Sequence, residues 1–339
     1  MCLSCEARYA IIEYVLILLS HHELQQILSP ELLQHHQQIL GQLATDSNVA
    51  DKVALRSGVN WGRQFSQDFM VTLEALRGDG FWGKEAFWQY CGLAPEDIAN
   101  KNICVFCGGS GREAYHLAAA QAGRIIVIDI GQHLFNIPRL LPYLTPILLL
   151  VLTDFYFSPV KENGADITIC DHAMQHIDDH ARAYSKLCRT TRGGGLVSIC
   201  VYSHENNFIM NYLVEPAKCI LHRFGNTGIK FFSHIPAIIL YATNTAYTFM
   251  QTAFGVETGH LPYAKLFALW RKDGYAKFHE ACFDLIHAPI SYHFKYREVH
   301  ALAHNNGLTL KKLEMINSTM WTMLAQKPIR PTGLHVDQG

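Results

Sequence analysis

The spacing of hydrophobic positions changes near residue 100 of this 339-residue chain. Before that point, apolar residues recur every three or four positions, over 7–27 and again over 32–43, which predicts amphipathic helices. After it, short apolar runs alternate with helix-like segments. Such runs are too short for buried helices and are typical of parallel strands covered on both faces. The runs occupy residues 103–106, 124–130, 147–152, 165–170 and 196–202.

This alternation is interrupted and then resumes. Residues 208–290 contain longer helical runs with many aromatic residues, which predict a helical cap inserted after the fifth strand. A helix over 292–306 ends at Gly307, and 308–316 and 319–326 alternate as two closing strands. We therefore predict an N-terminal helical lid (1–95), a core (96–202), the cap (203–291), a return to the core sheet (292–330) and a tail (331–339).

The stretch from Asn102 to Asp129 contains the clearest motif of the chain. Its first apolar run is followed at once by three glycines and a helix that begins at Arg112, and its second run ends at Asp129. Glycines let a ligand approach the backbone, where the N–H groups of a helix start can bind it. A carboxylate about 20 residues after the glycines suits a ribose diol. We therefore predict a βαβ unit with a nucleotide-like ligand at its carboxyl edge.

This stretch resembles motif I and the following acidic position of class I S-adenosylmethionine (SAM) dependent methyltransferases. The resemblance continues to Ser203 and resumes near Tyr292. Two positions depart from the family, which usually has an acidic residue in place of Val105 and a glycine in place of Cys107. The resemblance implies an α/β, Rossmann-like sheet of about seven strands with the last one antiparallel, and SAM as cofactor. A dinucleotide such as NAD would also suit the glycines and the acid.

The resemblance also implies which residues contact SAM. They lie at the glycine turn and at the ends of three successive strands, where ligands of open α/β sheets bind. In the family, an acid after the third strand often faces the adenine amino group, and Asp154 matches it; a turn carboxylate is the alternative. The implied cofactor-binding residues are Cys107, Gly108, Gly109, Ser110, Gly111, Asp129, Asp154, Phe155, Asp171 and His172.

Candidate catalytic residues follow the fourth and fifth strands. For methyl transfer to a small or apolar acceptor, His176, Asp171 or Glu205 would remove a proton from the nucleophile. Ser203 and Asn207 belong to the same polar cluster as Glu205, and a solvated loop is the alternative for that cluster. We predict no metal site, because the spaced histidines near 172–180 begin before the helix and lack the HExxH pattern.

A second enzymatic hypothesis needs no acceptor. The stretch YSHENNF and the long N-terminal lid are similar to bacterial azetidine-2-carboxylate synthases, which are SAM lyases on the same fold. There the α-amine of SAM would attack its own γ-carbon and release methylthioadenosine. That amine must be uncharged, and Val105 and Cys107 do not favour its protonated form. Ser203 and Asn207 would then hold the amine and carboxylate. A SAM-binding regulator is the third hypothesis.

Composition limits the partners of the protein. The formal net charge of −1 predicts no global attraction to nucleic acid or to an anionic membrane. Ten cysteines without disulfide-type regularity, and no visible signal peptide, favour a cytoplasmic location. We expect a small-molecule substrate, and a homodimer is compatible with the sequence. The aromatic-rich segment 58–83, which includes Trp61 and Trp82, would either close over the ligand or pack against the core.

Overall fold

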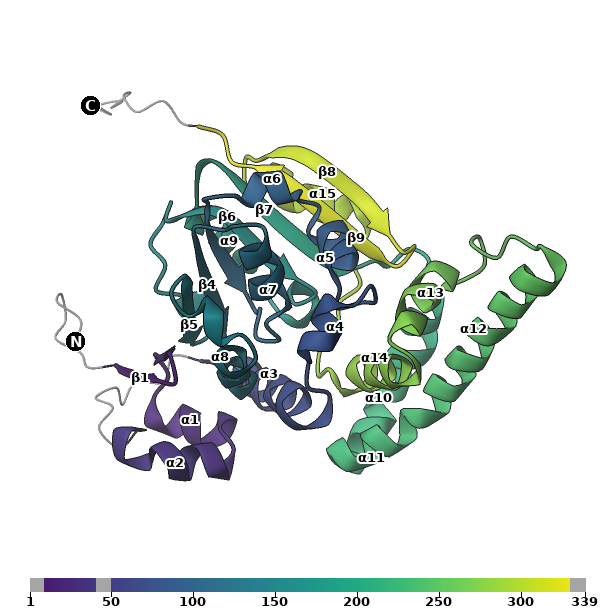
Figure 1. The fold of residues 1–339 in the computed structure, drawn as a ribbon, viewed down its shortest axis with the longest axis horizontal. Coiled ribbons are helices and arrows are strands. Elements are labelled where there is room, and N and C mark those ends of the chain that lie inside the picture. Colours follow the sequence, from purple (N-terminus) through teal and green to yellow (C-terminus); the bar gives the residue numbers. More distant parts are fainter. Residues whose placement is uncertain (1–8, 41–49, 330–339) are drawn as a thin grey trace.

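A nine-stranded mixed sheet forms the centre of the protein in the computed structural model, which describes residues 9–40 and 50–329 (Figure 1). The strand order is β1-β2-β5-β4-β3-β6-β7-β9-β8. Strands β2, β5, β4, β3, β6 and β7 are parallel, whereas β9 runs antiparallel to β7 and β8. The strands are β1 (Ala10–Ile12), β2 (Val15–Ile17), β3 (Asn102–Phe106), β4 (Arg124–Asp129), β5 (Leu148–Leu152), β6 (Ala165–Asp171), β7 (Thr191–Tyr202), β8 (Thr309–Ile316) and β9 (Met320–Gln326).

Helices cover both faces of this sheet. In β3, Ile103 and Val105 belong to one buried cluster, whereas Cys104 and Phe106 belong to another, because successive side chains point to opposite faces. The first cluster includes residues of α5 (Lys84–Cys91) and α7 (Arg112–Ala119), and the second includes residues of α9 (His180–Thr190) and α15 (Tyr296–Asn305). The α/β class, the parallel strands, the antiparallel strand and the helical insertion are thus confirmed.

The first described residues differ from the prediction. Instead of a helix over 7–27, the chain forms the hairpin β1–β2 and then α1 (His21–Ile27). Strand β2 pairs in parallel with β5, so the sheet has nine strands rather than about seven. The physical reason is that β5 would otherwise end the sheet with unpaired backbone groups, and the buried Val15 and Ile17 cover that edge.

The other described residues before the core are mostly helical, as predicted. It contains α2 (Pro30–Leu40), α3 (Lys52–Arg63), the π-helical turn η1 (Gln64–Asp68), α4 (Leu73–Arg77), α5 and α6 (Pro95–Ile98). The tail predicted at 331–339 lies outside the described residues.

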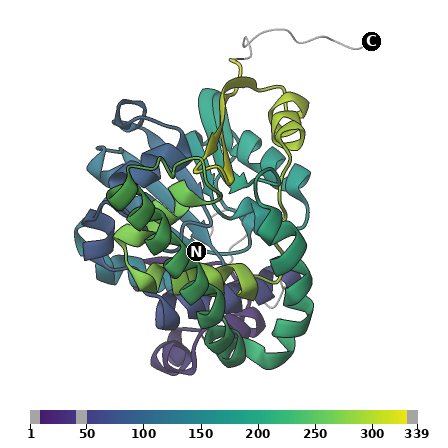
Figure 2. The same cartoon turned by 90° about the vertical axis from the view of Figure 1, so that its right-hand side faces the viewer.

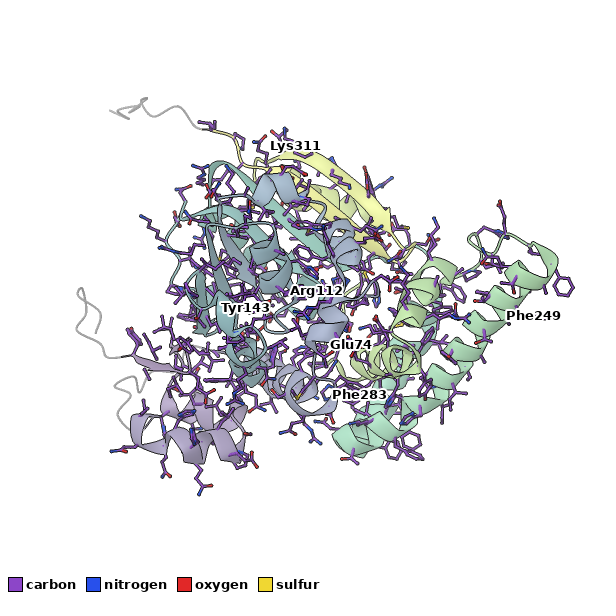
Figure 3. All side chains as sticks on the ribbon, viewed as in Figure 1. Glu74, Arg112, Tyr143, Phe249, Phe283 and Lys311 are labelled. Atoms are coloured by element: carbon purple, nitrogen blue, oxygen red, sulfur yellow. The ribbon has the colours of Figure 1, made fainter. Side chains whose placement is uncertain are left out.

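The cap stands beside the carboxyl edge of the sheet, as Figures 1 and 2 show from two directions. It comprises η6 (Met210–Val214), α10 (Glu215–Leu221), η7 (His222–Phe224), α11 (Gly225–Phe232), α12 (His234–Phe254), α13 (Ala264–Lys272) and α14 (Tyr275–His287). Phe249 points away from the body on α12, whereas Arg112 lies in the interior (Figure 3). Within the described ranges, no helix has the length and apolar character needed to cross a membrane.

Candidate functional site

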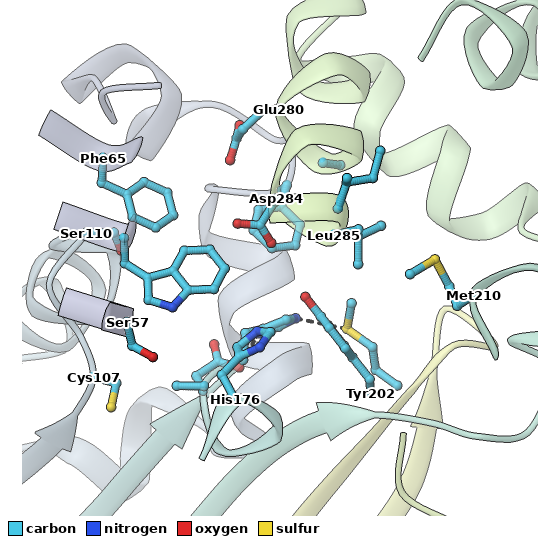
Figure 4. Close-up of a pocket in the computed structure, with 18 of the residues that line it drawn as sticks. Ser57, Phe65, Cys107, Ser110, His176, Tyr202, Met210, Glu280, Asp284 and Leu285 are labelled. Carbon is cyan, nitrogen blue, oxygen red and sulfur yellow. Dashed lines mark hydrogen bonds and ion pairs between the residues drawn. The ribbon is translucent and has the colours of Figure 1, made fainter. Parts of the chain in front are cut away.

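A cavity of about 490 Å³ lies between the carboxyl edge of the sheet, the N-terminal segment 50–95 and the cap (Figure 4). Contacts between that segment and the cap close one side of it. Gln64 Nε2 donates to Asp284 Oδ1 at 2.6 Å, Lys230 Nζ donates to Asp68 Oδ1 at 2.6 Å, and the Phe81 amide donates to an Asp273 carboxylate oxygen. The cavity is therefore enclosed by elements that are far apart in the sequence.

Asp129 and the glycine turn meet at one end of this cavity. The Gly109 amide donates to Asp129 Oδ2 at 3.0 Å, and the Gly131 amide donates to Oδ1 at 2.8 Å. Burial acts to raise the pKa of Asp129, but His133 and the two amides outweigh it and hold the pKa below its ordinary value. A side chain at Gly109 would collide with the His133 ring and Asp129. The site thus places an ionised carboxylate beside a backbone segment that has no side chain at Gly109.

The two other glycines of the turn act through the backbone. A Cβ at Gly108 would collide with Val105, so the turn packs tightly against β3. Gly111 has φ of 84° and begins α7, in a left-handed conformation that favours glycine. Neither residue lines the cavity, whereas Ser110 does.

Three non-glycine residues of the cavity wall have left-handed backbone conformations, and two of them lie at strand ends, whereas the third, Tyr263, directly precedes α13. Cys107 has φ of 60° at the end of β3, and His172 has φ of 54° at the end of β6. Cys107 therefore has a backbone conformation that favours glycine, which is the residue usual at this position in the family pattern. Such residues persist only where their surroundings hold them, and they cluster at ligand sites. The location of Cys107 and His172 on neighbouring strands agrees with the prediction of a ligand at this edge.

Asp154 and Phe155 follow β5 and line the cavity, as the prediction required. Asp154 Oδ1 accepts from the Tyr156 amide at 2.7 Å, and burial raises the pKa of Asp154 to about 6. Its role toward an adenine ring stays a prediction.

Asp171 lies in a buried ionic cluster that the sequence did not reveal. It pairs with the Arg112 guanidinium, and its Oδ1 lies 2.5 Å from His172 Nδ1. Arg112 also lies 3.3 Å from Glu113 Oε1. Burial alone would raise the pKa of Asp171, but His172 and Arg112 lower it below its ordinary value. Both neighbours stabilise the ionised form of Asp171 and so make it a weaker proton acceptor, and its role as a catalytic base stays a prediction.

Ser203 and Glu205 do not line the cavity, which corrects their assignment as residues that carry the reaction. Glu205 accepts hydrogen bonds from the Tyr296 amide at 3.0 Å, Trp321 Nε1 at 3.1 Å and Ser203 Oγ at 3.0 Å. Asn207 does line the cavity, but its Nδ2 donates to the carbonyls of Ser203 and Thr319 at 2.6 and 2.8 Å. These residues therefore fasten the end of β7 to its neighbours.

His176 faces the cavity with its ring against Trp61, at 5.0 Å between ring centroids. Its Nδ1 donates to the Ile290 carbonyl at 2.7 Å, and Gln175 Nε2 lies 3.4 Å from its Nε2. Burial lowers the pKa of His176 to about 3. The ring is therefore neutral at physiological pH.

The cap contributes acidic groups that sequence reasoning missed. Glu280 and Asp284 project from α14 into the cavity (Figure 4). Lys277 Nζ lies 3.0 Å from Glu280 Oε1 and 3.9 Å from the centroid of the Phe81 ring. Burial raises the pKa of Asp284 to about 7. The only sequence signal was the spacing of 277, 280 and 284, which places all three on one helix face.

Residues 105–199 match a family model described as a methyltransferase domain. The matched segment runs from β3 into β7 and contains the glycine turn, Asp129 and Asp154. Together with the sheet order, this match defines the class: the chain has the class I SAM-dependent methyltransferase fold. The matched domain supports a SAM-dependent methyltransferase enzyme that uses SAM as its cofactor.

Several solved structures are similar to this one. A putative methyltransferase from Haloferax volcanii, in complex with the Trm112 methyltransferase activator, has 12% identity and a TM-score of 0.46, covering 76% of this chain and 95% of its own. A putative SAM-dependent methyltransferase from Methanococcus maripaludis has 12% identity and a TM-score of 0.41, covering 85% and 100%. Human N-acetylserotonin methyltransferase with SAM has 11% identity and a TM-score of 0.40, covering 72% and 55%. No curated protein sequence matches the chain.

Proposed function

We propose that the protein transfers the methyl group of SAM to a small, largely apolar acceptor bound beneath the cap. The observation that carries this proposal is the continuity of the cavity. The same space that borders Asp129 extends to side chains of the cap, most of which are apolar, with Lys277, Glu280 and Asp284 as charged exceptions. Those side chains include Ile209, Met210, Leu213, Leu240, Leu266 and Phe267. A pocket of this kind suits an apolar molecule oriented by a few polar groups.

The residues at the sheet edge fit SAM. The ionised Asp129 would accept hydrogen bonds from the two ribose hydroxyls, and Asp154 and Phe155 would border the adenine. Cys107, Ser110 and His172 would surround the methionine part, because they follow the adjoining strands β3 and β6. When bound, SAM supplies a methyl group on a positively charged sulfur.

The protein itself contributes enclosure and orientation. The rings of Trp61, Trp82 and Tyr202 line the cavity and would favour a cation without offering a competing nucleophile. The contacts between segment 50–95 and the cap close one side of the cavity and would limit the access of water to the reacting groups. Holding the acceptor behind the methyl carbon is the main requirement of this reaction.

Cyclisation of SAM is the second candidate. In its favour, Val105 is fully buried in the sheet, so β3 offers no carboxylate that would keep the amine of SAM protonated. Against it, the Ser203 hydroxyl is bonded to Glu205 outside the cavity and is not placed to hold that amine. We therefore rank methyl transfer first.

A substitution that fills the cap end of the cavity tests the first candidate. Met210→Trp should leave SAM affinity unchanged in calorimetry and lower the release of S-adenosylhomocysteine with apolar hydroxyl, thiol and amine acceptors at least tenfold. Ile220→Trp is the matched control, because Ile220 is exposed and does not line the cavity. Equal turnover in both variants would mean that the cap does not form part of the acceptor site.

A further inference from the structure

The carboxylate of Asp284 faces the cavity, and no basic side chain of the described residues forms an ion pair with it. Its Oδ1 accepts one hydrogen bond, from Gln64 Nε2 at 2.6 Å. The two lysines nearest to it have other acidic partners: Lys277 lies 3.0 Å from Glu280, and Lys218 lies 2.8 Å from Glu215. In Figure 4, Asp284 points into the same space as His176 and Tyr202. The second carboxylate oxygen is therefore directed at whatever fills the cavity.

An ionised carboxylate buried in apolar surroundings is unfavourable unless it is paired. The groups that face Asp284 are Gln64 from η1, Tyr202 from β7, Lys218 from α10, and Lys277 and Glu280 from its own helix. When Glu280, Glu215 and Asp284 are all ionised, two lysines face three carboxylates, so the ionised cluster lacks one positive charge. A ligand with a cationic group would supply it.

We propose that the methyl acceptor carries a basic nitrogen, and that Asp284 first binds its ammonium group and then receives one of its protons. This inference rests on the proposed methyl transfer and names the chemical class of the acceptor. The surrounding rings suit the same ligand, because Trp61, Trp82 and Tyr202 line the cavity and aromatic faces attract cations.

The steps balance in protons and electrons. The ammonium group transfers one proton to the Asp284 carboxylate, which leaves a neutral amine and a neutral carboxylic acid. The nitrogen lone pair then forms a bond to the methyl carbon while the carbon–sulfur bond breaks and its electron pair stays on sulfur. The methylated nitrogen carries the positive charge, and Asp284 returns its proton to solvent when the product leaves.

The other candidate bases are less suited to this step. His176 has both ring nitrogens engaged and a pKa lowered to about 3 by burial. Asp171 is held by Arg112, and Glu280 is held by Lys277. Asp284 has a pKa raised to about 7 by burial, and a base is most effective when its pKa is near the working pH.

Matched ligands and variants test the inference. Phenylalkylamines with two to five chain carbons are compared with the corresponding phenylalkanols at pH 8, where Asp284 is ionised. Binding is followed by tryptophan fluorescence and calorimetry, and methylation by S-adenosylhomocysteine release. The variants are Asp284→Asn, which keeps the shape and lets the Gln64 amide rotate to accept a hydrogen bond, and Glu257→Gln, an exposed control outside the cavity.

We expect the amines to bind the unmodified protein more tightly than the alcohols, and Asp284→Asn to weaken amine binding about tenfold to a hundredfold while alcohol binding is unchanged. Equal binding of amine and alcohol, no amine binding, or full amine binding by Asp284→Asn would each overturn the inference. Methylation of an alcohol but of no amine would keep methyl transfer and reject the basic nitrogen. Enzyme-dependent loss of SAM without any acceptor would instead reject the proposed function.

Discussion

Replacing Asp284 by asparagine should stabilise the ligand-free protein at alkaline pH. Burial raises the pKa of this carboxyl from 3.8 to about 7. Since the folded pKa lies above the unfolded one, the protonated form favours folding at low pH, and this contribution disappears as the pH rises from about 4 to about 7. A shift of roughly three pKa units corresponds to about 4 kcal/mol at the alkaline limit. About 2–3 kcal/mol of it develops between pH 5 and pH 8.

Urea unfolding at pH 5 and pH 8 measures this effect directly. The stability difference between Asp284→Asn and the unmodified protein should grow by about 2–3 kcal/mol from the lower to the higher pH, in favour of the variant. The control Glu257→Gln should show no such trend, because Glu257 is exposed. A difference that is the same at both pH values would mean that Asp284 has an adequate partner in the empty protein. The argument for a missing cation would then fail.

Three further predictions concern other parts of the site. Asp129→Asn should weaken SAM binding in calorimetry by about 1.5–3 kcal/mol, because the ribose hydroxyls lose a charged acceptor; unchanged affinity in a folded variant would remove Asp129 from the site. Hydrogen exchange over residues 61–82 should slow when SAM is added, because this segment helps to enclose the cavity, and equal exchange with and without SAM would make it scaffold. Asn207→Ala should lower the free energy of unfolding by about 1–3 kcal/mol, since two buried carbonyls lose their donor; an unchanged urea midpoint would contradict its structural role.

The strands of the core could be predicted because each one is marked by a short apolar run in its own sequence. Within β4, residues 125–128 are all apolar, and such a short apolar run indicates a strand buried on both faces without any knowledge of its neighbours. The N-terminal hairpin could not be predicted in this way. The spacing over 7–27 favoured a helix, but the nearly continuous apolar run from Tyr9 to Leu19 is also compatible with short buried strands. What decides between them is the free edge of β5, which lies more than a hundred residues away in the sequence.

The site residues likewise fall into those that meet through local sequence and those that meet only through long-range packing. The glycine turn and Asp129 lie within one βαβ unit, so their meeting follows from the order of the elements. The pairing of Arg112 with Asp171 joins two units, and Asp284 reaches the cavity only through the packing of the cap. Glu205 was misassigned because a position at a strand end does not say which way the side chain turns.

The central claim, methyl transfer from SAM within this cavity, is tested most directly with SAM that carries three deuterium atoms on its methyl group. The protein is incubated with this SAM alone and then together with the phenylalkylamines, and the products are identified by mass spectrometry. We predict that SAM alone persists, and that an acceptor yields equal amounts of S-adenosylhomocysteine and an amine bearing the deuterated methyl group. Methylthioadenosine that retains the deuterium, formed without an acceptor and together with azetidine-2-carboxylate, would contradict the account.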